Sequence, residues 1–360
     1  MTNLYFQNPD DTNSHNLLEA LLDASAMSDS GGGAYAFATK SGLELLLDDE
    51  VFISFVNRGS FDLIIGVDAI TSIKALDKIN QYIANAPTLS AKVLMATDGV
   101  IFHPKVSWFR RGNTGILVCG SGNLTDAGLR YNWESISISH LNQTEVNSVE
   151  TSWNLFKQNS KNRLVDLNHP EVIRKARLNS KAKFRTKSKT KKSTITSTGN
   201  SVLIAEIPNN NKRFTQANFH KKTFVGFFGA HPGTQHRVVF YNVDCNGVLQ
   251  HREIRPSVTS KSKNYRFELG ALSGKSYPSV GRPIGVYIMI AVRTFKYSVL
   301  FPNDNGYTQM HSYLSKSAKK KGHQMLEVLT TEHALKAIWP ESPLWKISLP
   351  EDEFFDPSLP

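Results

Sequence analysis

Residues 101–125 read IFHPKVSWFRRGNTGILVCGSGNLT: two runs rich in apolar residues, joined by a Gly-Asn turn and followed by a Gly-Ser-Gly-Asn turn. This pattern predicts two adjacent strands. Side chains two apart in a strand point the same way, so His103 and Lys105 are expected on one face. Asn123 comes from the turn after the second strand. The three polar groups can therefore converge on one point.

The segments around this pair predict an α/β domain over residues 1–175, with a sheet flanked by helices. Helical periodicity marks residues 16–24, 41–49, 70–86 and 144–160, and strand-like composition marks 50–56, 61–68, 90–97 and 133–141. SDSGGGAY at 28–35 predicts a flexible loop. NLYFQN at 3–8 resembles a protease-site scar, so we assign it no structural role.

The charge of the chain favours a polyanionic partner. Its 360 residues include 42 Lys and Arg against 31 Asp and Glu, a net charge of +11. Nucleic acid is the first candidate and a membrane surface the second. There is no membrane-length apolar run and no leader pattern, so we expect a cytoplasmic protein without a membrane partner. Cys119 and Cys245 are far apart and predict neither a zinc site nor a disulfide framework.

A basic segment separates the two halves of the chain. Between Arg174 and Lys192, ten of nineteen residues are Lys or Arg and none is acidic. Like charges repel, which predicts an extended linker over residues 176–199. Such a linker either only tethers the domains or also contacts phosphates.

Residues 200–360 predict a second, mostly β domain, a small barrel or an open sandwich. Its seven strand-like segments are 201–207, 222–230, 236–244, 248–256, 264–270, 285–292 and 295–301, and two helices are expected near 310–321 and 330–339.

The residues of the opening stretch suit phosphodiester chemistry. A neutral histidine can attack phosphorus, a lysine can neutralise the non-bridging oxygens, and an asparagine amide can donate to them. A carboxylate such as Glu134 can accept the other imidazole N–H and orient the ring. The alternative is that His103 is an ordinary strand histidine, because H-x-K also occurs by chance at His220–Lys222. WFRR at 108–111 either lines a DNA channel or ends an edge strand.

HPK followed by GSGNLT resembles the phospholipase D superfamily motif H-x-K-x4-D-x6-G-S-x-N, over about residues 30–165. The motif's Asp position holds Arg110. In lacking this Asp, the chain resembles the metal-independent restriction endonucleases of the BfiI and NgoAVII kind, which lack it too. The resemblance implies a catalytic set of His103, Lys105, Asn123 and Glu134, with Ser121 supporting the turn. It also implies a covalent phosphohistidine, no cofactor or metal, and a homodimer, because one chain carries only one motif.

For the second half, the same resemblance implies a B3-like pseudobarrel that reads double-stranded DNA through two arms, residues 209–222 and 252–266. The candidate DNA contacts are Lys212, Arg213, Gln216, Asn218, Lys222, Arg255, Lys261, Lys263 and Asn264. The implied function is a sequence-specific, type II-like restriction endonuclease, which a separate helicase-like ATPase can accompany. Two alternatives stay open: a nonspecific phospholipase D-type nuclease or phosphodiesterase, and a non-catalytic DNA-binding protein with a degenerate nuclease fold.

Overall fold

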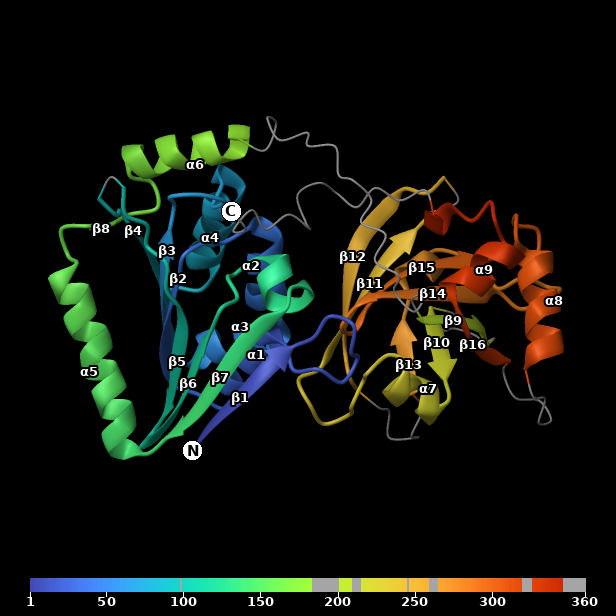
Figure 1. Cartoon of the computed structure of the whole chain (residues 1–360), viewed down its shortest axis with the longest axis horizontal. Helices are drawn as coiled ribbons and strands as arrows, with labels where there is room; N and C mark the ends of the chain where they lie inside the picture. Colours follow the sequence, from blue (N-terminus) through green and yellow to red (C-terminus); the bar gives the residue numbers. More distant parts are fainter. Residues whose placement is uncertain are drawn as a thin grey trace. The chain divides into compact units, whose positions relative to one another are not determined.

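The computed structural model describes residues 1–97, 99–182, 201–208, 215–244, 246–258, 265–318 and 326–345. These form two compact units (Figure 1). The first comprises residues 1–9 and 14–182, and the second comprises 10–13 and 201–345. Within the described residues, no helix has the length and apolar character needed to cross a membrane.

The first unit is built on a mixed eight-stranded sheet in the order β1-β7-β6-β5-β2-β3-β4-β8. β2–β3 and β3–β4 pair in parallel, and the other neighbours are antiparallel. The strands are β1 (Thr2–Gln7), β2 (Ser30–Tyr35), β3 (Ser60–Gly66), β4 (Leu89–Leu94), β5 (Lys105–Arg111), β6 (Thr114–Gly120), β7 (Glu134–Leu141) and β8 (Leu164–Val165).

Helices cover both faces of this sheet, as the sequence predicts (Figure 1). They are α1 (Leu17–Ala26), α2 (Lys40–Leu47), α3 (Glu50–Arg58), α4 (Ile73–Asn85), α5 (Gln143–Asn159), α6 (Pro170–Ala182) and the short π-helix η1 (Ala127–Tyr131). On one face, Phe55 of α3 packs against Phe61 and Phe109 of the sheet. On the other, Trp153 of α5 packs against Trp108 of β5, with ring centroids 6.4 Å apart.

Two expectations for this unit are wrong. The glycine-rich residues 28–35, expected to form a loop, include the interior strand β2. A side chain at Gly32 would lie 2.7 Å from Trp108 Nε1, so this glycine makes room for the tryptophans of one face. Residues 50–56, expected to form a strand, belong to α3: Asp49 caps its N-terminus, and Phe52, Phe55 and Val56 are its buried residues, at helical spacing.

Two further segments also depart from expectation. The NLYFQN stretch lies mostly in the edge strand β1, which pairs antiparallel with β7, and the Gln7 side chain donates to the backbone oxygen of Asn132 at 2.9 Å. The predicted linker is helical as far as Ala182, the end of α6. Helix therefore extends into the basic segment that charge repulsion predicts to be extended. The rest of the predicted linker lies outside the described residues.

The second unit holds a six-stranded sheet in the order β12-β11-β15-β14-β9-β16 and a two-stranded ribbon, β10-β13. The strands are β9 (Ser201–Glu206), β10 (Gln216–Phe219), β11 (Arg237–Val243), β12 (Leu249–Pro256), β13 (Tyr265–Glu268), β14 (Ile284–Ala291), β15 (Thr294–Leu300) and β16 (Glu327–Thr331). The helices are α7 (Lys221–Gly226), α8 (Tyr307–Ser317) and α9 (Glu332–Ile338), with the 3-10 turns η3 (Gly270–Leu272) and η4 (Pro343–Trp345).

The six-stranded sheet has a separate core on each face. Leu203 and Ala205 of β9 pack with the aromatic residues of the ribbon and α7, whereas Val202 and Ile204 pack with α8 and α9. Across the described residues, the strand order ends at β12 and β16, so the sheet is open and the predicted pseudobarrel is not closed. The described residues thus form an open six-stranded sheet, with the two-stranded ribbon packed on one face.

One predicted strand of this unit is also wrong. Residues 222–230 include most of helix α7 and no strand. Phe224, Phe227 and Phe228 follow i, i+3, i+4 spacing and are all buried in the core beside the ribbon. A short apolar run bounded by glycine fits a strand or a helix equally well, so composition alone does not separate the two.

Candidate active site

The polar residues of the opening stretch lie along one edge of the eight-stranded sheet, the edge formed by the ends of its strands. β5 begins at Lys105, the antiparallel β6 ends at Gly120, and β7 begins at Glu134. The end of β2 lies at the same edge, because Tyr35 pairs with Lys105. Segments distant in sequence therefore meet where β2 and β6 end and β5 and β7 begin.

His103 lies just before β5 rather than in it, which corrects the expectation that His103 and Lys105 share one strand. The Pro104 carbonyl still accepts a hydrogen bond from Ala36 N at 2.9 Å, which ties this loop to the segment after β2. The His103 side chain is exposed, and the Phe37 ring meets it edge-on at 5.8 Å between centroids.

The Lys105 ammonium contacts the imidazole directly. Its Nζ lies 3.0 Å from Nδ1 and 3.1 Å from Nε2 of His103. The same ammonium is positioned to attract an anion that approaches His103.

Ser121 and Glu134 form a second pair at this edge. The Ser121 hydroxyl donates a short hydrogen bond to Glu134 Oε2, and its oxygen accepts from Ser135 N at 3.0 Å. Asn132 Nδ2 donates to Glu134 Oε1 at 3.2 Å. Both carboxylate oxygens therefore have donors that fix their orientation. Asn132 was not among the predicted site residues, and only its position two residues before Glu134 marks it in the sequence.

Asn123 is almost fully buried, with 2% of its surface exposed. Its loop is held by the segment after β2: Leu124 N donates to Phe37 O at 3.2 Å, and Thr39 N donates to Leu124 O at 3.0 Å. No described donor lies within hydrogen-bonding distance of the buried Asn123 Oδ1. This oxygen is therefore an acceptor that its own loop does not use, and any donation to an anion would come from Nδ2.

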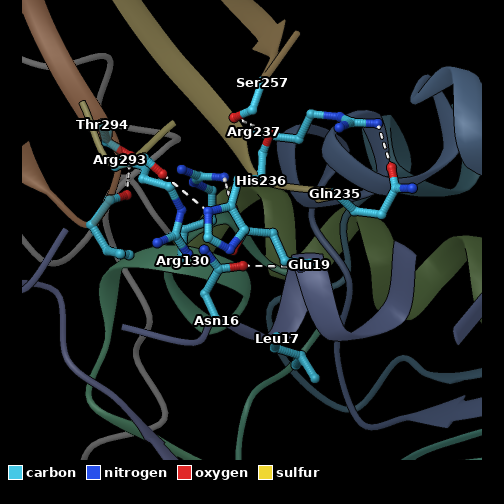
Figure 2. Close-up of polar contacts among 12 residues, drawn as sticks. Asn16, Leu17, Glu19, Arg130, Gln235, His236, Arg237, Ser257, Arg293 and Thr294 are labelled. Carbon is cyan, nitrogen blue, oxygen red and sulfur yellow. Dashed lines mark hydrogen bonds and ion pairs between the residues drawn. The ribbon is translucent and has the colours of Figure 1, made fainter. Parts of the chain in front are cut away.

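η1, which follows the Asn123 loop, packs closely against it: a side chain on Gly128 would lie 2.6 Å from Asn123 N. Arg130 of η1 reaches Glu19 of α1, with Nη1 4.0 Å from Oε1 (Figure 2). The sequence does not indicate this pair, because Glu19 and Arg130 are 111 positions apart and belong to no recognisable motif.

Arg110, at the motif's Asp position, lies toward the opposite end of β5. Its Nη1 is 2.8 Å from Glu150 Oε2 and 2.8 Å from Asn147 Oδ1, both on α5. β5 is an interior strand, and Trp108 and Phe109 are buried. These two aromatic residues therefore neither line a channel nor end an edge strand. Among the described residues, no three His, Cys, Asp or Glu side chains gather as metal ligands would.

In the second unit, four of the nine candidate DNA contacts are described. Gln216 and Asn218 lie on β10, where Gln216 Nε2 donates to Glu268 Oε1 at 3.2 Å. Lys222 is exposed on α7, and the Arg255 guanidinium donates to Glu268 O at 2.6 Å. Lys212, Arg213, Lys261, Lys263 and Asn264 lie outside the described residues.

The β10–β13 ribbon connects the two predicted arms. β10 lies within the first arm and β13 begins at the end of the second, and Asn218 pairs with Arg266 across the ribbon. Elsewhere in this unit, Arg237 Nη2 donates to Gln235 Oε1 at 3.3 Å, and the Ser257 hydroxyl donates to His236 O at 3.0 Å (Figure 2).

No family model matches the chain, and no curated protein matches it. Among solved structures, it is similar to a phospholipase D family member, Nuc from Salmonella typhimurium, with 19% identity and a TM-score of 0.34 over 46% of this chain and 98% of Nuc. It is also similar to NucT from Helicobacter pylori, with 12% identity and a TM-score of 0.34 over 46% of this chain and 98% of NucT.

A third similar structure is the N-terminal domain of Helicobacter pylori LlaJI.R1, with 14% identity and a TM-score of 0.26 over 37% of this chain and 98% of that domain.

Proposed function

We propose that the chain is a sequence-specific DNA endonuclease of the type II-like restriction class, with His103 as its nucleophile. The observation that carries this proposal is the contact of Lys105 Nζ with both nitrogens of an exposed imidazole, at 3.0 and 3.1 Å. The oriented Glu134 carboxylate lies at the same sheet edge. A nucleophile beside a cation and near an orienting carboxylate suits phosphoryl transfer.

In the proposed first step, an imidazole nitrogen of His103 attacks phosphorus. A P–N bond forms, the P–O bond to one strand breaks, and the leaving oxygen takes up a proton. Lys105 and the Asn123 amide stabilise the charge on the non-bridging oxygens. Glu134 accepts the N–H of the other ring nitrogen once the substrate is bound. The nucleophile and its electrostatic support all come from side chains, so this step requires no metal.

The leaving oxygen needs an acid, and the chain carries one such motif. We place the acid on His103 of a second copy, in a composite site on a two-fold axis. In the second step the roles reverse: the second histidine takes a proton from water, water attacks phosphorus, and the P–N bond breaks. The products are a phosphate monoester and free His103. One site then cuts one strand at a time.

Recognition of double-stranded DNA is assigned to the second unit. The net charge of +11 attracts the phosphate backbone. The β10–β13 ribbon places Arg266, whose guanidinium suits guanine or phosphate, opposite Asn218. A helicase-like ATPase subunit stays a proposal that rests on the sequence resemblance. The rivals are a nonspecific phosphodiesterase and a non-catalytic DNA-binding protein.

The test is incubation of the purified protein with plasmid DNA in EDTA, followed by electrophoresis. We expect discrete fragments. A smear would favour the nonspecific phosphodiesterase, and retarded but intact DNA would favour the binding protein. His103→Ala should abolish cutting and keep DNA binding. His140→Ala removes an exposed histidine near the other end of β7 and is the matched control that should cut normally.

A further inference from the structure

The loop after β3, residues 67–72, contacts the residue before His103 and the segment after β2. Asp68 Oδ2 accepts a hydrogen bond from the backbone N of Phe102, the residue before His103, at 3.2 Å. Thr71 Oγ1 accepts from Ala38 N at 3.1 Å. Ala38 adjoins Phe37, whose ring meets the imidazole. This loop therefore supports the nucleophile through a backbone amide and through an aromatic neighbour.

Helix α6 holds this loop in place from outside. Lys175 Nζ lies 2.9 Å from Asp68 Oδ1, and their side chains are 23% and 10% exposed. Asn179 Nδ2 lies 3.0, 3.0 and 2.9 Å from the carbonyl oxygens of Val67, Ala69 and Thr71. Two N–H groups thus serve three carbonyls of one short loop, which fixes its backbone path.

The loop needs such support because Ile70 has φ of +40°. A β-branched residue is an outlier in this region of backbone space, and such strain persists only where the surroundings enforce it. The Ile70 side chain is buried and packs with Ala36 and Phe37. The strained residue therefore transmits the loop conformation to the aromatic ring beside His103.

We infer that Lys175 and Asn179 of α6 are positioning residues for His103, acting through the loop of Asp68. None of the three is assigned a contact with DNA or with the reacting phosphorus. Small displacements of a nucleophile lower reaction rates strongly, because the attacking atom must stay in line with the leaving oxygen. This inference rests on the proposed nucleophilic role of His103, and it gives Lys175 a role besides its charge in the basic segment.

The test compares three lysine variants of the whole chain. Lys175→Met breaks the pair with Asp68, whereas the control Lys157→Met breaks a similar helix-to-strand pair, with Nζ 2.6 Å from Asp62 Oδ2. In single-turnover cleavage with EDTA, we expect Lys175→Met to be at least about tenfold slower with an unchanged Kd for DNA. Lys157→Met should stay within about twofold of wild type, and Lys175→Arg should recover most of the rate.

A second measurement does not depend on catalysis. In NMR spectra of protein labelled with [15N]histidine, His103→Ala identifies the His103 ring signals among the eleven histidines. We expect Lys175→Met to shift those signals and Lys157→Met to leave them in place. If Lys175→Met leaves them unmoved, the inference is wrong. If wild type cuts no DNA, the proposed function fails, and the ring signals alone decide whether α6 positions His103.

Discussion

At the residue scale, the feature that best distinguishes this site from a chance H-x-K match is Glu134. The carboxylate has two donors, Ser121 and Asn132, which together fix its plane. A surface glutamate without a role would not need both oxygens oriented, because side-chain entropy favours a free carboxylate. We therefore expect its charge, and not only its shape, to matter in the reaction.

Glu134→Gln tests this expectation because it keeps the size of the side chain and removes its charge. Single-turnover cleavage should fall by about 10²-fold or more, since an imidazole held in the wrong tautomer or left unstabilised as a cation is a poor catalyst. Glu145→Gln, in the capping box of α5, is the control and should cleave like wild type. A Glu134→Gln rate within about threefold of wild type would remove Glu134 from the catalytic set.

At the element scale, the site depends on the close approach of α2 to the Asn123 loop. A Cβ atom on Gly42 would lie 2.3 Å from Leu124 O and 2.6 Å from Thr125 Cα. Both neighbours are backbone atoms, so they cannot move aside as a flexible side chain would. α2 can approach this loop so closely because Gly42 has no side chain, and the close contact helps to hold Asn123 in position.

Gly42→Ala should consequently lower stability, although alanine normally stabilises a helix. We expect a loss of about 1–3 kcal/mol in the free energy of unfolding of the first unit, together with slower cleavage. Gly226→Ala, in a helix where nothing lies within 4 Å of the new Cβ, is the control and should be neutral or slightly stabilising. Chemical denaturation decides this, and a stabilised Gly42→Ala would contradict the packing described for α2.

Many of the helices and strands could be predicted from the sequence, and the wrong assignments have a common cause. Long amphipathic helices such as α4 and α5 are found where periodicity places them. β2, α3 and α7 are misassigned because their character depends on tertiary partners: Gly32 of β2 makes room for Trp108, and the phenylalanines in and just after α3 and α7 are buried. The contact of His103 with Lys105 has a sequence signal, whereas the Asp68–Lys175 pair spans 107 positions and has none.

At the scale of the whole molecule, one chain offers one histidine motif, and the proposed reaction uses two histidines in different protonation states. The two units separate the proposed tasks: the first carries the site residues, and the second carries the ribbon that joins the two arms. A composite site makes activity depend on pairs of chains, which a mixture of active and inactive subunits can reveal.

We expect wild type mixed with an equal amount of His103→Ala, after subunit exchange, to show about one quarter of the cleavage rate of the same total concentration of wild type. Only dimers with two intact histidines are then active. Independent sites would give about one half, and that result, with exchange verified by differently tagged subunits, would contradict the composite site. Sedimentation of the wild type should show a dimer of the 40.2 kDa chain.

The most direct measurement is capture of the covalent intermediate. Protein and labelled DNA substrate are mixed in EDTA, quenched with denaturant within the first turnover, and digested for mass spectrometry. The account predicts an acid-labile DNA adduct on the peptide that contains His103, absent from His103→Ala and present in His140→Ala. DNA cleavage with no adduct, or with an adduct on another residue, would contradict it.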